Sequence, residues 1–301
     1  MKKIFRVAIP VMASFCALNS CQKTNNSNTS TATPVQTYLS SDTSLALYNA
    51  LVIKANDSYM FTGTDSITML APTDSAFAAA GITAQTIAGW STTAADSILR
   101  YHYIDANANL VSGSYTSFSS MLSPAIYGFT DGTNYYFNGR PAVKATLPSG
   151  TATIYKLGNV LQVPAASISQ WLSADTSLSF FTEALTRTGL GASLGVSGWN
   201  TIFAPVNSAF ISYGFTNVDT LDVNVLSNIM QYHILNGQYF SNTLASQVTV
   251  GAEEGGYINI SSAAGTLQLT GTSNTSAATV LSANNLAGNV IVHKIDHLLL
   301  P

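Results

Sequence analysis

One segment of the chain occurs twice, and this duplication restricts the folds that are open to it. "TMLAPTDSAFAAAGIT" at residues 68–83 and "TIFAPVNSAFISYGFT" at residues 201–216 share Thr, Ala-Pro, Ser-Ala-Phe, Gly and Thr at the same places. Upstream, "YLSSDTSLALYNAL" from Tyr38 aligns with "WLSADTSLSFFTEAL" from Trp171 at the same offset of 133 residues. A constant offset means that no residues were inserted between these two parts of the repeat.

The repeat continues downstream with a slightly shorter offset. "ILRYHYI" at residues 98–104 matches "IMQYHIL" at residues 229–235, and "GNVLQV" from Gly158 aligns with "GNVIVH" from Gly288. This period is much longer than a solenoid repeat, so each copy is expected to be a complete domain with its own core. The boundary is placed near Ala165, which gives one domain at residues 35–165 and a second at residues 166–301.

Each copy is expected to mix helices and strands in one order. An early amphipathic helix precedes a strand at "ITMLAP" or "NTIFAP", a helix starts at "DSAF" or "NSAF", a further helix runs into "YH", and the rest is mostly β structure. The Asp131-Gly132 pair between apolar runs predicts a hairpin turn. Strands that gather late, without βαβ alternation, indicate an α+β fold.

The repeated segment itself predicts a corner between a strand and a helix. Pro72 and Pro205 should end their strands, because proline has no N–H to donate to a sheet. Asp74 and Asn207 are expected to cap the helix that follows by accepting a bond from a free backbone N–H. The phenylalanine three residues further along should anchor that helix in the core. An architectural role is preferred for this whole segment.

The first residues have the pattern of a secretory signal. Lys2, Lys3 and Arg6 precede an uncharged stretch at residues 7–18, which is too short to span a membrane as a helix. The stretch ends in "LNSC", which resembles the lipobox of bacterial lipoproteins and predicts a lipid anchor on Cys21. The alternative is an ordinary secretory signal with an incidental cysteine.

The remaining N-terminal residues fit an exported, anchored protein. The only other cysteine, Cys16, lies in the predicted signal peptide at residues 1–20, so the mature chain would have no disulfide to form. Residues 21–34 are polar without an apolar period and are expected to form a flexible tether. A net charge of −3 provides no basic surface, so nucleic acid is not an expected partner.

Several quoted segments together resemble fasciclin (FAS1) domains. "TMLAPTDSAF" and "TIFAPVNSAF" are similar to the first signature of that family, and the two Tyr-His pairs are similar to its central motif. "FNGRPAV" at residues 137–143 resembles its Asn-Gly turn, and "GNVIVHKIDHLLLP" at residues 288–301 its closing signature. The resemblance implies a wedge of β-strands with several packed helices per domain, and a role in adhesion or binding at a cell surface.

Both copies depart from the family pattern near their ends. In the first copy "GNVLQVPAA" has no His and no Ile-Asp, so its final strand is expected to be shortened. In the second copy "GN" at residues 288–289 stands where the family usually has Asn-Gly. The first departure bears on whether both domains bind a ligand.

The histidines are the main candidates for chemistry. His293 and His297 flank Asp296, but on a strand they would lie about 13 Å apart at roughly 3.3 Å per residue, too far to share one zinc ion. On a helix the pair would suit a metal, but the apolar alternation around it favours a strand, and no metal site is expected. His102 and His233 end apolar helical patterns, which favours buried, neutral imidazoles bonded to backbone over a catalytic or ligand-binding role.

No standard enzyme motif accompanies these residues. The sequence has no G-x-S-x-G elbow, Walker loop or dinucleotide fingerprint. Tyr135 and Tyr136 alternate on a predicted strand, so one ring could stack on a sugar, although packing within the hairpin is preferred. The motif residues expected to be structural, with binding as the alternative, are Tyr101, His102, Tyr232, His233, Pro72, Asp74, Pro205, Asn207 and Asp296.

The sequence therefore predicts a non-enzymatic adhesion or binding protein of a bacterial cell envelope, held by a lipid on Cys21, in the outer membrane. Its expected partners are the membrane and an extracellular or periplasmic protein or polysaccharide, and no cofactor is expected. One alternative is a glycan-binding lipoprotein of a polysaccharide-uptake system. Another is an unrecognised hydrolase, which a clustered and perturbed histidine and carboxylate pair in a cleft would favour.

Overall fold

The computed structural model describes residues 33–57, 66–147 and 152–301. The predicted signal peptide, Cys21 and most of the predicted tether lie outside this part of the chain. The end of the tether was placed too far along, because helix α1 (Pro34–Ser41) already includes Pro34. Thr33 caps that helix in a reciprocal pair of bonds with Gln36, and proline suits the first turn because no N–H is needed there.

Each repeat forms one seven-stranded sheet, and every strand pair joins strands of the same repeat. The strand orders, β2-β1-β7-β6-β5-β4-β3 and β9-β8-β14-β13-β12-β11-β10, are identical by position. The first sheet contains β1 (Thr68–Pro72), β2 (Tyr103–Ile104), β3 (Thr116–Ser119), β4 (Ala125–Thr130), β5 (Tyr135–Phe137), β6 (Arg140–Ala145) and β7 (Thr153–Leu157). The second contains β8 (Asn200–Pro205), β9 (Ile234–Asn236), β10 (Thr249–Gly251), β11 (Tyr257–Ala263), β12 (Thr266–Thr270), β13 (Ala278–Ala287) and β14 (Val290–Ile295).

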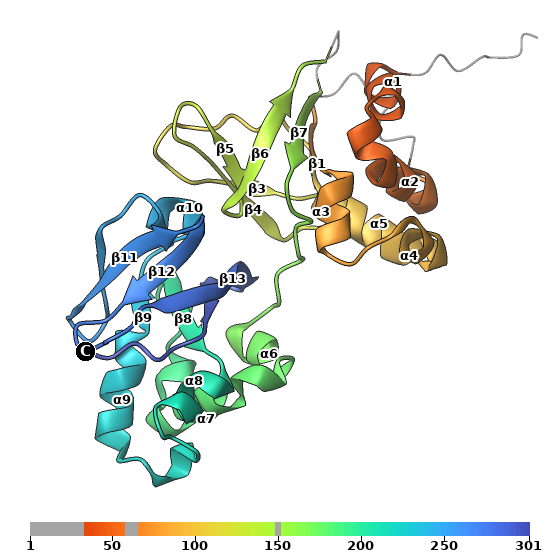
Figure 1. Ribbon diagram of the computed structural model, residues 1–301. Coiled ribbons are helices and arrows are strands. Elements are labelled where there is room, and N and C mark those ends of the chain that lie inside the picture. The colour runs from red at the N-terminus through yellow and green to blue at the C-terminus, as the bar shows by residue number, and fades with distance from the viewer. Residues whose placement is uncertain (1–32, 58–65, 148–151) are drawn as a thin grey trace, which may run out of the picture. The chain divides into compact units, whose positions relative to one another are not determined.

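Most helices of each repeat gather beside one parallel strand pair, next to β1 in the first and β8 in the second, while α10 lies apart from them (Figure 1). The first repeat contains α1, α2 (Ala46–Ala55), α3 (Asp74–Ala79), α4 (Ala84–Gly89) and α5 (Thr92–Tyr101). The second contains α6 (Ile168–Ser173), α7 (Ser179–Thr188), α8 (Asn207–Ser212), α9 (Val223–Tyr232) and α10 (Ser241–Leu244). Short 3-10 turns add η1 (Thr43–Leu45), η3 (Thr176–Leu178), η4 (Leu190–Ala192) and η5 (Val218–Thr220). The predicted α+β fold with two tandem copies is confirmed.

The prolines end the central strands as predicted. β1 is buried along its whole length and stops at Pro72, and β8 stops at Pro205. β1 pairs in parallel with β7, with Pro72 opposite Leu157, and β8 pairs in parallel with β14 in the same way. The predicted hairpin at Asp131-Gly132 is also present, since β4 pairs with β5 on either side of it.

The predicted capping role of Asp74 and Asn207 is wrong in its target. Thr73 caps α3, and no side chain caps α8. Instead Asp74 Oδ1 accepts the N–H of Leu47 at 2.8 Å, and Asn207 Oδ1 accepts the N–H of Phe180 at 3.1 Å. These N–H groups lie in the first turns of α2 and α7, which have no cap from their own neighbours. The repeated polar residue therefore joins two helices.

The early helix predicted from "SSDTSL" and "SADTSL" is two helices with a short 3-10 turn between them. Asp42 caps η1 through the N–H and hydroxyl of Ser44, and Asp175 repeats this arrangement at η3. Lys156 on β7 binds Asp42 at 3.1 Å, and Lys294 on β14 binds Asp175 at 2.6 Å. The aspartate thus fixes the helix break and ties it to the last strand of its repeat.

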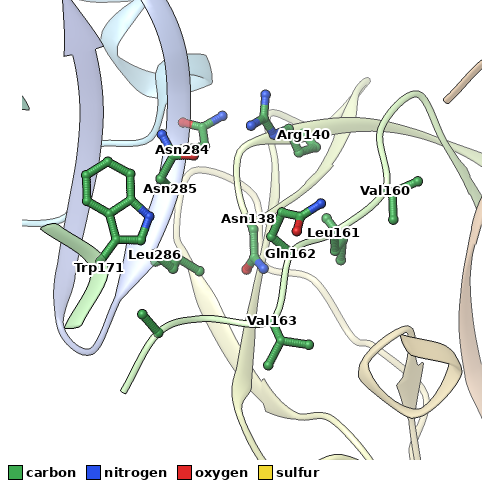
Figure 2. Close-up of a pocket in the computed structure, with 11 residues that line it drawn as sticks. Asn138, Arg140, Val160, Leu161, Gln162, Val163, Trp171, Asn284, Asn285 and Leu286 are labelled. Atoms are coloured by element: carbon green, nitrogen blue, oxygen red, sulfur yellow. The ribbon is translucent and has the colours of Figure 1, made fainter. Parts of the chain in front are cut away.

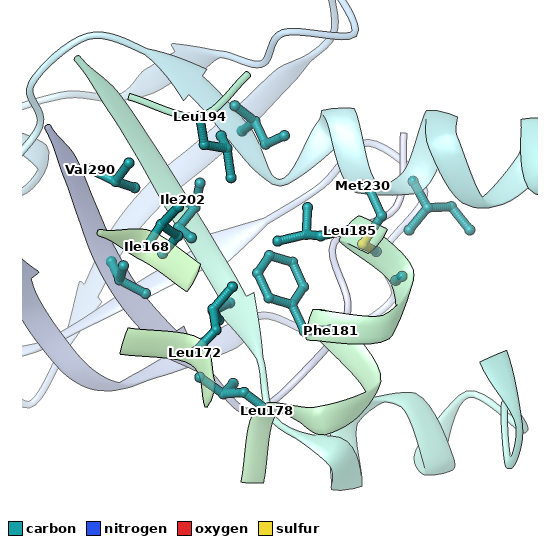
Figure 3. Packing of buried hydrophobic residues seen from close by; sticks show 14 of the residues in the cluster. Ile168, Leu172, Leu178, Phe181, Leu185, Leu194, Ile202, Met230 and Val290 are labelled. Atoms are coloured by element: carbon teal, nitrogen blue, oxygen red, sulfur yellow. The ribbon is translucent and has the colours of Figure 1, made fainter. Parts of the chain in front are cut away.

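Four hydrophobic clusters of the described residues each lie within one repeat, two in the first and two in the second. In the largest cluster Phe181 of α7 packs among Leu172, Leu185 and Ile202 (Figure 3). A fifth, smaller cluster contains residues of both repeats. Every helix in residues 33–57, 66–147 and 152–301 is too short or too polar to cross a bilayer.

The fifth cluster is centred on Phe240 of the second repeat, which is fully buried. Tyr115 and Tyr127 of the first repeat contact its ring, with centroids 5.1 and 6.2 Å away. Gly139 lies against it with a φ of +69°, and a Cβ at this position would come within 2.6 Å of Phe240 Cβ. Its carbonyl accepts a bond from Asn284 at 3.1 Å. Residues 33–301 accordingly form one compact unit.

Replacing Asp74 tests whether a residue of the repeated segment caps α2. Asp74→Ala leaves the Leu47 N–H without its acceptor and is expected to lower the free energy of unfolding by about 1 kcal/mol, the usual value of a helix cap. Asp74→Asn keeps an oxygen at the same place and should retain most of that stability. Urea denaturation measures both. Equal losses in the two variants would contradict the cap.

Candidate functional site

The Tyr-His pairs lie where a helix ends and a strand begins. α5 ends at Tyr101 and α9 at Tyr232, and His102 and His233 follow as the C-cap residues. All four side chains are fully buried. The predicted position of His233 on the core face of its helix is confirmed.

Both imidazoles bridge two backbone segments. His102 Nδ1 lies 2.8 Å from Ile98 O, and its Nε2 lies 3.0 Å from the backbone N of Leu161. His233 makes the same contacts with Ile229 O at 2.8 Å and with the N of Leu299 at 2.9 Å. Because a backbone N–H can only donate, Nε2 accepts, and the proton is on Nδ1. Each ring is therefore neutral and links its helix to the segment after the last strand.

Burial acts in the same direction on both rings. Desolvation of the charged form lowers the pKa of His102 from 6.5 to about 4, and the pKa of His233 falls equally to about 4. With both nitrogens bonded to backbone and no exposed surface, neither ring can take a proton from a substrate without breaking a structural bond. This geometry favours the structural interpretation of the motif.

The tyrosine of each pair bonds to a connection between two later strands of its sheet. Tyr101 Oη accepts a bond from Asn138 Nδ2 at 2.9 Å, and Tyr232 Oη accepts one from the N–H of Thr272 at 3.0 Å. The acceptor role and the burial are the same in both repeats. The donors lie in the equivalent connections, β5 to β6 and β12 to β13, although one is a side chain and the other is backbone.

The predicted pairing of "GNVLQV" with "GNVIVH" is wrong. The parallel strand pairs place Leu157 opposite Pro72 and Ile295 opposite Pro205, so Leu157 and Ile295 are equivalent. "GNV" at residue 158 therefore follows β7, whereas the same letters at residue 288 lie in the turn before β14. The first copy has a complete last strand, not a shortened one.

The "GN" at residues 288–289 lies in a different turn from Asn138 and Gly139. Asn138 and Gly139, with φ of 48° and 69°, form the tight turn between β5 and β6. The equivalent connection in the second repeat is the longer segment at residues 271–277, between β12 and β13. Gly288, with φ of 58°, turns between β13 and β14 instead.

The remaining histidines do not converge. His293 lies on β14, fully buried, and its Nε2 donates to Tyr239 O at 2.9 Å. Burial also lowers its pKa to about 4. His297 lies beyond the strand and bonds Asp296 at 2.8 Å. Within the described ranges no three His, Cys, Asp or Glu side chains come together as a metal site.

Tyr135 and Tyr136 are half-buried in the sheet and make ring contacts within the first repeat. Tyr135 lies 5.3 Å from the Tyr155 ring and Tyr136 lies 6.1 Å from the Phe129 ring. Tyr136 therefore packs within the hairpin of β4 and β5, whereas Tyr135 packs against β7. Sugar stacking by these tyrosines stays a prediction.

Several residues that complete the contacts of the two Tyr-His pairs could not be predicted from the sequence pattern. Leu161 and Leu299 contribute only a backbone N–H, which no side-chain pattern reveals. Asn138 belongs to the Asn-Gly turn, and its side chain also accepts the N–H of Tyr127 and donates to Tyr101. An asparagine at φ > 0 in a tight turn is a usable signal, because its side chain then commonly bonds to nearby backbone.

Replacing His233 separates a structural role from a ligand-binding role. His233→Ala leaves the Leu299 N–H and the Ile229 carbonyl unpaired and opens a cavity, so a loss of about 1 to 4 kcal/mol in unfolding free energy is expected. Any loss of binding should follow the unfolded fraction in thermal melts. A variant of unchanged melting temperature that no longer binds its partner would assign the motif to the ligand.

The lowered histidine pKa values predict acid sensitivity. In the unfolded chain a histidine titrates near 6.5, while His102 and His233 do so near 4 in the fold. The unfolded state therefore binds more protons, so stability is complete above about pH 6.5 and falls as the pH approaches 4. Each ring contributes up to roughly 1.4 kcal/mol per pH unit in this window.

His102→Gln should flatten this pH dependence, measured as the unfolding free energy between pH 4.5 and 7. Leu99→Ala, a buried residue on the same helix, serves as a control that lowers stability equally at every pH. An unchanged slope in His102→Gln would show that the ring does not titrate as the geometry requires.

Comparison with known proteins agrees with this architecture. A family model described as the fasciclin domain matches residues 41–164 and again residues 176–301. The protein sll1735 of Synechocystis is 30% identical over 42% of this chain and 92% of its own length. The transforming growth factor-beta-induced protein ig-h3 of Sus scrofa is 26% identical over 50% of this chain, and human periostin is 26% identical over 56%.

The match covers only about a fifth of ig-h3 and periostin, 21% and 20% of their lengths. Among solved structures, a FAS1 domain pair from the insect cell adhesion molecule fasciclin I aligns with 86% of this chain and 97% of its own. Its sequence identity is 16% and the TM-score is 0.42. With the fasciclin domain matched in both repeats, the chain belongs to the fasciclin domain family.

Proposed function

We propose that this protein is a non-enzymatic adhesion or binding protein, anchored by a lipid on Cys21 to the outer membrane of a bacterium. The observation that carries the proposal is the duplicated Tyr-His network in a tandem fasciclin pair. In both copies the imidazoles are occupied by backbone, so the side chains best suited to acid-base chemistry are used to hold the fold. A domain built in this way presents surfaces and not a reaction centre.

The adhesive role is proposed from the fasciclin domain that both repeats match. Because this chain matches only part of ig-h3 and periostin, their partners are not carried over to it. The partner proposed here is a protein or polysaccharide outside the cytoplasm.

The anchor is supported by the N-terminal sequence alone. Basic residues, an apolar stretch and "LNSC" occur in the order of a lipoprotein signal, followed by a polar segment before the first helix. Two or more acyl chains, at about 0.8 kcal/mol per buried methylene, hold a protein stably on a membrane. The polar segment would give the two domains freedom to reach a partner beyond the membrane surface.

Removing the acylated thiol tests the anchor. Cells that produce Cys21→Ala should release the protein from the membrane fraction, whereas Cys16→Ala, a matched change within the predicted signal peptide, should leave it there. Immunoblots of fractionated cells measure the distribution. A Cys21→Ala protein that stays in the membrane fraction would sink the proposal of a lipid anchor.

Adhesion is measured separately with the same strains. Cells with the anchored protein should attach to surfaces or to each other more than cells making Cys21→Ala, because only the anchored form can link cell and partner. Equal attachment of the two strains at equal protein levels would contradict the adhesive role.

A further inference from the structure

A pocket of about 380 Å³ lies within the unit formed by residues 33–301 and is lined by residues of both repeats. Asn138 and Arg140 come from the β5–β6 turn and β6, and Gln162 from the segment after β7. Trp171 on α6 and Asn284 and Asn285 on β13 form the facing wall (Figure 2). This volume is in the range of small-molecule sites.

Arg140 brings a positive charge to this pocket. Its Nη2 donates to Ala283 O at 2.6 Å, and no carboxylate of the described residues lies within ion-pair distance of its guanidinium. Partial burial lowers its pKa, yet an arginine stays charged in a protein. A desolvated cation without a counter-ion is unfavourable, so the site favours an anionic ligand.

The amide groups of the pocket fall into two kinds. Asn138 and Asn284 are held in place by bonds to Tyr101 and to Gly139 O, one on each side of the pocket. Gln162 is exposed and makes no hydrogen bond to other described residues. Its amide is therefore available to bond with the hydroxyl groups of a ligand.

The aromatic residue at the position of Trp171 differs between the two repeats. Its counterpart Tyr38 donates its hydroxyl to Asp42 at 3.0 Å. Trp171 makes no such bond to Asp175, whose partners are Ser177 and Lys294, and it lines the pocket, opposite Gln162 (Figure 2). An aromatic face suits the apolar C–H face of a sugar ring, while amides suit its hydroxyls. An arginine fork binds a carboxylate through two parallel bonds.

We propose that this pocket binds an acidic sugar, a hexuronate residue, with its carboxylate on Arg140 and its ring against Trp171. The inference rests on the binding role proposed above and names the chemical class of the ligand. It requires neither the lipid anchor nor a cell. An experiment can therefore contradict the ligand of the pocket without contradicting anchored adhesion, and the reverse.

Calorimetric titration of the purified protein with glucuronate tests the site, with glucose as the neutral analogue. Glucuronate should bind saturably, and glucose about tenfold more weakly or not at all, because a charge-assisted pair with arginine is lost. Acetate and sulfate should compete poorly, since neither has a ring to contact Trp171.

Gln162→Glu is the decisive variant, because Gln162 has no bond whose loss would disturb the fold. The new carboxylate of Gln162→Glu should repel that of glucuronate and weaken its binding about tenfold or more. Gln162→Lys should retain binding. Arg140→Met should also abolish binding. Lys144→Met, an exposed cation on the same strand and outside the pocket, should not.

Failure to saturate with glucuronate, equal affinity for glucose, or an unchanged affinity in Gln162→Glu would overturn the proposal. Acetate or sulfate that competes as well as glucuronate would do so too, because the pocket would then recognise charge alone. If Arg140→Met unfolds, the Gln162 pair decides. Loss of cell attachment with glucuronate binding intact contradicts adhesion and leaves the pocket in place.

Discussion

The bond from a buried imidazole to the backbone of the last segment is the constraint on which each repeat depends. His102 and His233 sit where a helix ends, and each accepts the N–H of a leucine far along the chain. Because the ring must be neutral to accept, this bond fixes the protonation state of the site. The same side chain joins two distant parts of its repeat. It links the end of α5 or α9 to the segment that follows the last strand, β7 or β14.

Other polar side chains also join distant segments of each repeat. Asp74 and Asn207 cap a helix earlier in the chain, and Asp42 and Asp175 bind a lysine of the last strand. In each case one side chain joins segments that are distant in sequence. These two polar positions occur in both repeats, and so do the long-range contacts that they make.

Much of the fold could be predicted from the sequence. The duplication, the strand ending at Pro72, the hairpin at Asp131-Gly132 and the buried His233 follow from local patterns, and the structure contains them. The target of the Asp74 cap could not be found in this way, because Leu47 contributes a backbone N–H that any residue would offer. The pairing of the two "GNV" segments failed since identical letters mark a turn in one copy and a strand end in the other. Parallel pairing with β1 and β8, not letter identity, sets the register.

The close contact of Gly139 with Phe240 shows that the two repeats contribute different surfaces to their contact. The first repeat contacts its neighbour through the tight turn between β5 and β6, while the second receives that turn with α10 and the bulge of β13. These are different surfaces, so the contact is heterologous, of the head-to-tail kind that can extend into an array. In the second repeat the equivalent connection, between β12 and β13, is longer and packs against its own repeat, where Gly271 faces the Leu300 carbonyl. The tight turn that reaches Phe240 is thus a feature of the first repeat alone, although both repeats share one strand order.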